Sequence, residues 1–305
     1  MFRYGGTLDM GLIGGRQNLL LLVYVLSFFG FGVKAAVCPL NSWLPQAGVA
    51  PTPVTALLHA VAVVKSGAFA IIRLTYYCFG VTFLKGTWAQ YVVMAATMVT
   101  IIYGCSRAVK ETHLKRRLAY STISNLSYIL FGATIMTPLG LTAALSHMLF
   151  HGIMKICSFF CAGAVICQTG RTYVHQLDGL GRRMPRVFGI FTLSSLALMG
   201  VPGLCGFISK WNLASAAIES RQPLAYFGIV ALLLSAILTA IYMLTIVVRA
   251  FFPQKGFDGS SIAEVSDPGW YMLVPLFTFS VLIIYFGLGS IPLMDLLTDI
   301  GAGLL

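Results

Sequence analysis

The sequence predicts an all-α protein that crosses a membrane with about eight helices. Of its 305 residues, 58% are hydrophobic and only 10% are charged, and the mean hydropathy is +0.88. Soluble domains carry charge on about a quarter of their residues. Apolar runs of the roughly 18 residues or more that a bilayer requires also recur along the whole chain. These observations exclude a soluble globular domain and favour a polytopic membrane protein.

The apolar runs define the expected spans and the organisation of the chain. We expect residues 1–17 to form a mixed lead, residues 18–252 a membrane domain, and residues 253–305 a loop and a final transmembrane helix. The eight spans are expected at residues 18–40, 52–74, 90–107, 119–136, 141–168, 187–216, 225–252 and 271–294.

Basic residues outside the spans are distributed unequally between the two sides. An even number of helices puts both termini on one side, which receives five Lys and Arg, whereas the other side receives eleven. Basic loops stay in the cytoplasm. We therefore expect the loops at 108–118 and 170–186 to be cytoplasmic and both termini to face outward. The expected location is a prokaryotic inner membrane.

Four lysines, Lys34, Lys65, Lys155 and Lys210, lie within the expected spans without an acidic neighbour in the same spans. Each costs about 2.5–3.5 kcal/mol at the centre of a bilayer on insertion scales. Ionisable residues inside membranes usually mark an ion or proton path. Two of the four, Lys34 and Lys210, lie near span ends, where a lysine can instead extend its amine to the interface.

Two spans are interrupted by glycine and proline next to a lysine. Such breaks free backbone groups that lipid cannot satisfy, so they persist where they line protein or water. Paired breaks in separate parts of a transporter chain point to inverted repeats that build a conduction site, although ordinary proline kinks are the alternative. The break residues are Gly32 and Pro39 in the first span, and Pro202, Gly203 and Gly206 in the sixth.

Three titratable residues of the fifth span, His147, His151 and Lys155, are spaced i, i+4, i+8. They drift only about 80° around a helix and therefore share one face. Histidine titrates near neutral pH and can pass a proton through its two nitrogens, as a relay requires. A zinc-binding pair and core histidines bonded to carbonyls are the alternatives. His59 and Lys65 lie roughly 240° apart, so on one helix they would need water or another helix to communicate.

Other ligand chemistries have little support in the sequence. The seven cysteines are mostly in apolar segments without CxxC spacing and resemble small buried hydrophobic residues, so we expect no metal site. Dinucleotide, haem and iron–sulfur motifs are absent, so we expect no cofactor. The net charge of +11 is spread along loops between helices, which argues against nucleic-acid binding.

Several motifs together resemble one protein family. The segment 34–67 reads KAAVCPLNSWLPQAGVAPTPVTALLHAVAVVKSG, residues 114–128 read LKRRLAYSTISNLSY, and residues 200–211 read GVPGLCGFISKW. With the histidine-rich helix, they resemble the proton-translocating antiporter-like subunits of respiratory complex I, Mrp-type cation/proton antiporters and membrane-bound hydrogenases. The resemblance covers roughly residues 20–250.

The resemblance implies a fold of inverted five-helix repeats and a role in proton translocation within a multi-subunit membrane complex. It implies that Lys65 is the central proton-exchanging residue, with Lys34 on the input side. His147 and His151 would be relays, and Lys210 would lie at the exit half-channel. We add His59 and Lys155 to this path as neighbouring titratable residues.

One feature of the family is not found in this sequence. Members pair the residue that matches Lys34 with a glutamate on an earlier helix, and this chain carries no such glutamate. We therefore expect this chain to be the C-terminal part of the usual core, from a longer, split or shortened subunit, and to depend on an N-terminal segment or a neighbouring membrane subunit for that glutamate. A scaffold subunit that carries no ion and a sodium/proton antiporter component remain alternatives, although sodium favours carboxylate ligands that the spans lack.

Overall fold

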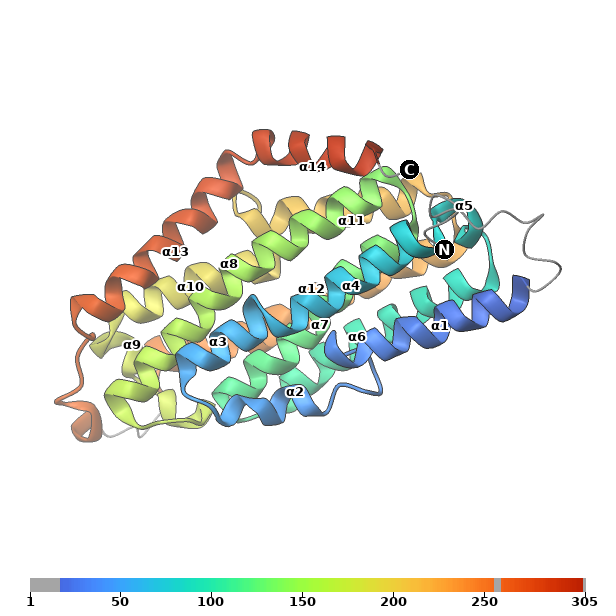
Figure 1. Ribbon diagram of the computed structural model, residues 1–305. Helices are drawn as coiled ribbons and strands as arrows, with labels where there is room; N and C mark the ends of the chain where they lie inside the picture. Colours follow the sequence, from blue (N-terminus) through green and yellow to red (C-terminus); the bar gives the residue numbers. More distant parts are fainter. Residues whose placement is uncertain (1–16, 255–258, 304–305) are drawn as a thin grey trace.

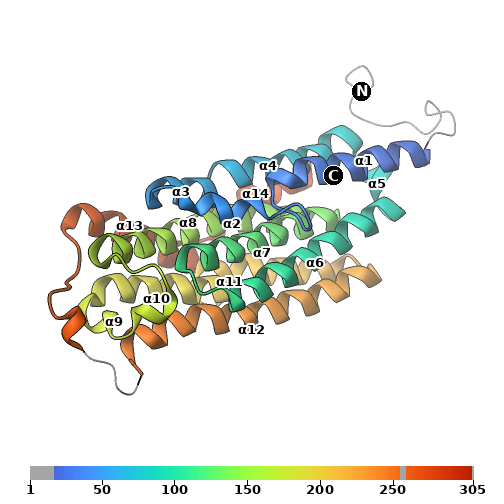
Figure 2. The ribbon, with the colours of Figure 1, turned by 90° about the horizontal axis from the view of Figure 1, so that it is seen from below.

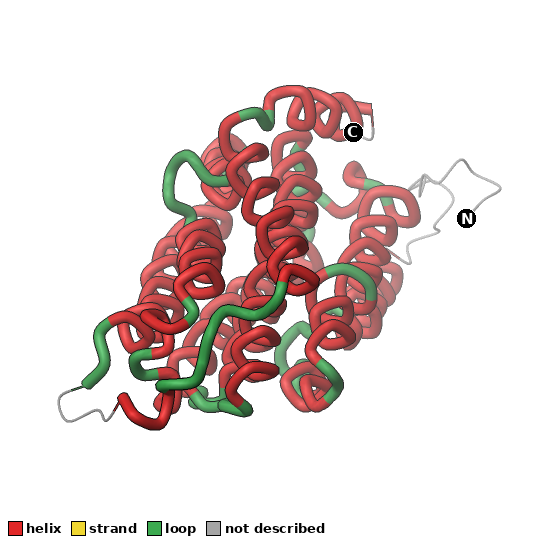
Figure 3. Tube along the Cα trace, turned by 90° about the vertical axis from the view of Figure 1, so that its left-hand side faces the viewer, coloured by secondary structure: helices red, strands yellow, loops and turns green. Residues whose placement is uncertain are grey.

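The computed structural model describes residues 17–254 and 259–303, and in these residues it consists of helices and connecting loops (Figure 3). The long helices lie side by side in one bundle (Figure 1). Their bounds are α1 Gln17–Lys34, α3 Thr52–Ala60, α4 Val63–Arg73, α6 Trp88–Lys110, α7 Leu114–Ile135, α8 Pro138–Thr169, α10 Pro185–Met199, α11 Cys205–Glu219, α12 Pro223–Phe251, α13 Trp270–Leu288 and α14 Ile291–Gly303. Short helices are α2 Trp43–Gln46, α5 Val81–Leu84 and α9 Leu180–Arg183, with 3₁₀ turns at Ala47–Val49, Val174–Leu177 and Gly259–Ile262.

Six helical segments in the described residues are long and apolar enough to cross a membrane, so the chain is an integral membrane protein. They are Gln17–Lys34, Thr52–Phe79, Trp88–Lys110, Pro138–Thr169, Pro223–Phe251 and Trp270–Leu288. The prediction of an all-α polytopic membrane protein is confirmed. The expected spans at 119–136 and 187–216 correspond to the polar helix α7 and to the pair α10 and α11.

The second crossing segment contains a break that the sequence did not reveal. Pro53 in the first turn starts α3, which stops at Ala60, and α4 begins at Val63. At the break the amides of both Val61 and Ala62 donate to the carbonyl of Leu57. Beyond α4 the helix continues as a π-helical turn, Leu74–Phe79, and ends at Gly80 with φ of 81°. The break therefore lies between His59 and Lys65.

Helices α6, α7 and α8 follow one another through tight turns. At Gly104 a Cβ would lie 2.8 Å from the amide nitrogen of Ser124, so the glycine allows α6 and α7 to pack closely. The turn from α7 to α8 uses Met136 in the left-handed region, and the Thr137 hydroxyl accepts from the amide of Gly140 to cap α8. Every residue of α7 from Ser121 to Ile135 is buried. In Figure 2, α7 lies between α12 and the pair α1 and α4.

The two predicted interruptions occur, with differences in detail. The first helix ends at Lys34 and is followed by turns that contain Pro39, while Gly32 lies inside the helix. Pro202 and Gly203 lie in the turn between α10 and α11, and Gly206 lies in the first turn of α11, where its missing Cβ makes room for the carbonyl of Ala197.

The end of the chain also differs from expectation. The span expected at 271–294 is divided into α13 and α14, which meet at an angle (Figure 1). Of the expected lead at 1–17, only Gln17 lies within the described residues. The start of α1 and the end of α14 lie at the same end of the bundle (Figure 1).

Candidate functional site

Helix α8 carries three of the predicted residues through the middle of the bundle. It packs against α3, α7, α10, α11, α13 and α14. His147, His151 and Lys155 are each 0% exposed. The two imidazole rings are stacked, with centroids 5.9 Å apart and planes 18° from parallel. Helical spacing thus produces a buried row of titratable groups along one face of α8.

Lys210 reaches one end of this row from the second break. Because α10 ends at Met199, its last carbonyls lack helical partners, and the Lys210 amine donates to those of Leu198 and Met199. A cation is electrostatically favourable at a helix C-terminus. The preceding residue, Ser209, places its Oγ 2.8 Å from Nδ1 of His147. The break therefore positions Lys210 and its neighbour against the histidine row.

Tyr128 of α7 contacts both Lys210 and His147. Its ring centroid lies 5.3 Å from the amine of Lys210 and 5.2 Å from the ring centroid of His147. The ammonium faces the aromatic ring, which is an attractive cation–π arrangement. Lys210, Tyr128 and His147 are consequently in one contiguous cluster.

Lys65 approaches the row from α4. Its amine donates to the backbone carbonyl of Met148, which lies between His147 and His151 on α8. A Cβ at Gly152 would collide with this amine, so the glycine opens the space through which Lys65 reaches α8. The break at Val61–Ala62 interrupts the helix just before this residue.

Lys155 is held by one hydroxyl group and one backbone carbonyl of α7. Its amine donates to the Ser121 Oγ at 2.7 Å and to the carbonyl of Leu118 at 3.2 Å. The Ser121 hydroxyl lies 2.6 Å from the hydroxyl of Tyr242, on α12. Arg117 donates to the backbone carbonyl of Tyr242 at 3.1 Å and thereby fixes that helix beside α7.

Several buried ring nitrogens have no protein partner among the described residues. Both nitrogens of His59, both of His151 and Nε2 of His147 are in this position. His59 stacks on Phe159 with centroids 5.1 Å apart. Buried polar atoms are nearly always hydrogen-bonded, to protein or to ordered water. The row is therefore suited to chains of water between titratable side chains.

Lys34 is separate from this cluster. Its side chain is exposed, and its backbone packs against Gly67 of α4. Within the described residues, no hydrogen bond or ion pair joins Lys34 to another side chain. The structure thus brings Lys65, His147, His151, Lys155 and Lys210 together, with His59 nearby, and leaves Lys34 on the surface.

Three residues that contact the row were not among the predicted site residues: Ser121, Tyr128 and Ser209. Tyr242, which contacts Ser121, was not predicted either. The sequence does contain a pattern that indicates a polar face on α7. Polar residues recur there every three or four positions, at Arg117, Ser121, Asn125 and Tyr128. The polar face of α7 is directed to the protein interior, since every residue of the helix from Ser121 to Ile135 is buried.

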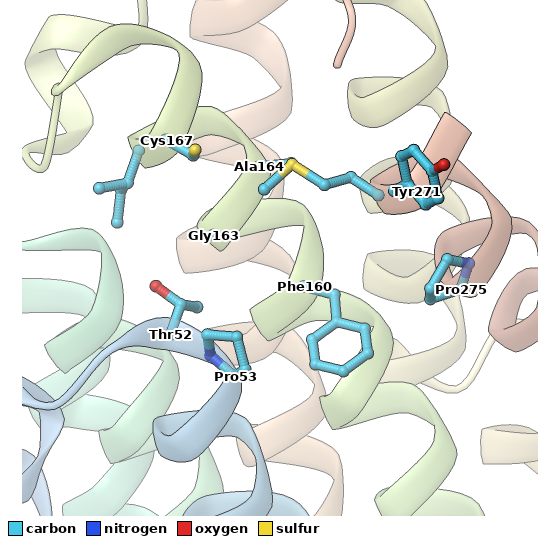
Figure 4. A pocket seen from close by; sticks show the side chains of 10 residues that line it. Thr52, Pro53, Phe160, Gly163, Ala164, Cys167, Tyr271 and Pro275 are labelled. Carbon is cyan, nitrogen blue, oxygen red and sulfur yellow. The ribbon is translucent and has the colours of Figure 1, made fainter. Parts of the chain in front are cut away.

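Other features of the described residues lie apart from the row. The ion pair Arg249–Asp178, at 3.4 Å, joins the end of α12 to the loop that follows α8. No group of three His, Cys, Asp or Glu in the described ranges converges as metal ligands would. An apolar surface groove of about 370 Å³ lies between α3, α8 and α13 and is lined by residues such as Thr52, Phe160, Gly163, Cys167 and Tyr271 (Figure 4).

Solved structures with the same arrangement of helices are membrane complexes. The chain aligns with one chain of the Mrp complex from Dietzia sp. DQ12-45-1b at a TM-score of 0.79 and 28% identity, covering 93% of this chain and 59% of that one. It aligns with a chain of an archaeal membrane-bound sulfane sulfur reductase at 0.82 and 27%, covering 94% and 57%. A chain of respiratory complex I from Thermus thermophilus shares the fold at 0.77 and 24%, covering 93% and 58%.

Sequence relatives are longer than this chain. It is 34% identical to NAD(P)H-quinone oxidoreductase chain 4-3 of Nostoc sp. over 81% of its own length and 44% of the relative's. It is 33% identical to NAD(P)H-quinone oxidoreductase chain 4 2 of Thermosynechococcus vestitus over 84% and 49%. The chain spans about half the length of these relatives. Residues 1–252 match the model of the family described as "NADH:quinone oxidoreductase/Mrp antiporter, TM", and the chain belongs to this family.

Proposed function

We propose that this protein carries protons through a membrane along the row formed by Lys210, His147, His151, Lys65 and Lys155. The observation that supports this most strongly is the convergence of three lysines, from α4, α8 and α11, on two stacked histidines at the centre of the bundle. Amines and imidazoles exchange protons, whereas purely structural packing at these positions would be served by apolar side chains.

A proton fits the row better than sodium does. Sodium is a hard cation that prefers carboxylate and carbonyl oxygens, by analogy with calcium and magnesium. The row, within the described residues, consists of amines, imidazoles and hydroxyls, and the carboxylate of Asp178 is paired with Arg249 at the end of α12. Protonated lysines would repel a sodium ion, whereas a neutral lysine can bind a proton covalently. We therefore assign the proton as the carried ion.

The protein is proposed to act as one subunit of a multi-subunit complex in a prokaryotic cell membrane. Its relatives are named as chains of NAD(P)H-quinone oxidoreductase, and the Mrp and sulfane sulfur reductase structures are complexes. Its many exposed apolar side chains along α12 and α13 would be covered by lipid and by neighbouring subunits. From the distribution of Lys and Arg between the two sides, we infer that both termini face outward.

Replacement of Lys65 by alanine tests this function. Lys65→Ala should abolish proton transfer by the complex and leave its assembly intact, because removing a partly buried charge relieves desolvation. Proton movement is measured with a pH-sensitive dye in proteoliposomes that contain the whole complex. Lys85→Ala, at an exposed lysine outside the bundle interior, is the matched control and should keep the wild-type rate.

The same experiment separates transport from a scaffold role. A complex that contains Lys65→Ala and moves protons at the wild-type rate would contradict the proposal. Failure of that variant to assemble, with normal activity in the molecules that do assemble, would mean that Lys65 is a structural residue of a scaffold subunit.

A further inference from the structure

The polar face of α7 lies directly opposite the row on α8. The two helices are antiparallel neighbours, since α7 ends at Ile135 and α8 begins at Pro138. Two contacts set their register: Ser121 with Lys155 at 2.7 Å, and the ring of Tyr128 with that of His147 at 5.2 Å. Any polar residue of α7 between Ser121 and Tyr128 on this face is therefore placed opposite the middle of the row.

Asn125 is that residue. It lies four positions after Ser121 and three before Tyr128, so all three share one face of α7. Likewise, His151 lies four positions from both His147 and Lys155 on α8. The two bracketing contacts thus place Asn125 opposite His151. Their side chains are 1% and 0% exposed, respectively.

Both side chains have buried polar atoms that no described protein group satisfies. The Asn125 amide nitrogen donates to the carbonyl of Ser121 at 2.8 Å, which fixes the orientation of the amide because only its nitrogen can donate. Its oxygen, Oδ1, has no donor. Neither ring nitrogen of His151 has a partner. Oδ1 of Asn125, an acceptor without a donor, therefore lies opposite the ring of His151, which lacks both a donor and an acceptor.

We propose that Asn125 holds a buried water molecule against His151 and that this water is a step of the proton path. A water molecule can donate to Oδ1 of Asn125 and exchange a proton with a nitrogen of His151, which gives the amide oxygen a donor and one of the two ring nitrogens a partner. In transfer, neutral His151 first takes up one proton from the Lys65 and His147 side of the row. The resulting imidazolium gives one proton to the water, and the water gives one to the neutral amine of Lys155, so water and histidine return to their original proton counts. Asn125 acts as a positioning residue, through the water.

The role in transport rests on the proposed function, whereas the water site stands on the unpartnered atoms alone. Its test is a high-resolution cryo-EM structure of the whole complex, combined with proton transport in proteoliposomes. The variants are Asn125→Leu, which keeps the volume without the amide, and Asn125→Gln, which keeps an amide oxygen. Ser127→Ala is the matched control, because this buried, unpartnered hydroxyl is on the same helix but about 200° away from Asn125.

The wild-type map should show a water within hydrogen-bonding distance of both Asn125 and His151, and Ser127→Ala should retain it. Asn125→Leu should lose the water and slow transport about ten-fold, roughly the effect of one lost hydrogen bond in the path. Asn125→Gln should recover part of the rate. A wild-type map without the water, or equal losses in Asn125→Leu and Ser127→Ala, would overturn the inference.

Failure of the inference is distinguishable from failure of the proposed function. A wild-type rate in Asn125→Leu, together with a lost rate in Lys65→Ala, removes the water from the path and leaves the function in place. Wild-type rates in Asn125→Leu and in Lys65→Ala would refute both the role of the water and the proposed function.

Discussion

At the scale of single residues, the site depends on glycines as much as on titratable side chains, because the glycines leave room for the lysines. Gly152 makes the clearest case, because the amine of Lys65 occupies the space that a Cβ at this position would take. The amine thereby reaches the carbonyl of Met148 between the two histidines. Gly200 ends α10 with φ of 93°. A Cβ at this position would lie 3.1 Å from Cδ of Lys210.

We expect Gly152→Ala to displace the amine of Lys65 and to slow proton transfer about ten- to hundred-fold, since small misplacements of reacting groups have effects of this size. Transport by the assembled complex in proteoliposomes measures it. Gly189→Ala is the control: it is also a helical glycine, and a Cβ there would meet nothing within 4 Å. Equal rates for the two variants would show that the position of Lys65 is unimportant.

The hydroxyl of Tyr242 is expected to contribute to both stability and transfer. It lies 2.6 Å from Ser121, the partner of Lys155, and donates to Thr239 at 3.2 Å. Tyr242→Phe leaves Ser121 short of one partner and should cost about 1 kcal/mol of stability, as for a typical buried hydrogen bond. Thermal unfolding of the purified complex checks this, with the fully exposed Tyr271→Phe as control. An unchanged melting temperature and transport rate in Tyr242→Phe would contradict this.

At the scale of helices, the sequence predicted what depends on composition and missed what depends on packing. The apolar runs located the crossing helices, and glycine and proline located the breaks near residues 34 and 200. The break between α3 and α4 occurs at Val61 and Ala62, which carry no such signal. The two halves have different main neighbours, since α3 packs mostly on α8 whereas α4 packs on α1 and α7.

Burial was also only partly predictable. The hydropathy of a segment reports whether it belongs in a membrane but not which of its faces the protein covers. Lys34 was placed among buried lysines, yet its side chain is exposed. Conversely, α7 is rich in polar residues and is among the most enclosed helices, because its polar face meets the row on α8.

The orientation of the helices leads to a labelling prediction. The loop between α6 and α7 contains or adjoins Lys110, Lys115 and Arg116, and such basic loops stay in the cytoplasm. In a protein whose exposed Cys78 and Cys167 are replaced by serine, Arg116→Cys should not react with an impermeant maleimide added outside. Lys85→Cys, expected on the opposite side, should react. The reverse pattern would invert the topology and the direction of the path.

At the scale of the whole molecule, the row of titratable groups is enclosed by the bundle, whereas Lys34 lies outside it on the surface. The central groups contact helices of this chain on several sides. Lys34 instead directs an exposed side chain outward from the end of α1. An exposed lysine at membrane depth requires an anion, water or a neighbouring protein to compensate its charge. Connection of Lys34 to the row therefore calls for a protein surface beyond the one that the described residues provide.

We accordingly expect the 305-residue chain, reconstituted alone in liposomes, not to move protons in a coupled manner. Within the described residues no carboxylate pairs with Lys34, so a membrane-embedded acid from another segment or subunit is needed to bring this lysine into the path. Proton uptake is measured with an entrapped pH dye under an imposed potential, for the chain alone and for the complex. The complex should be active, and Lys34→Ala should reduce its rate. Coupled transport by the chain alone would show that the central lysines and histidines suffice without a partner for Lys34.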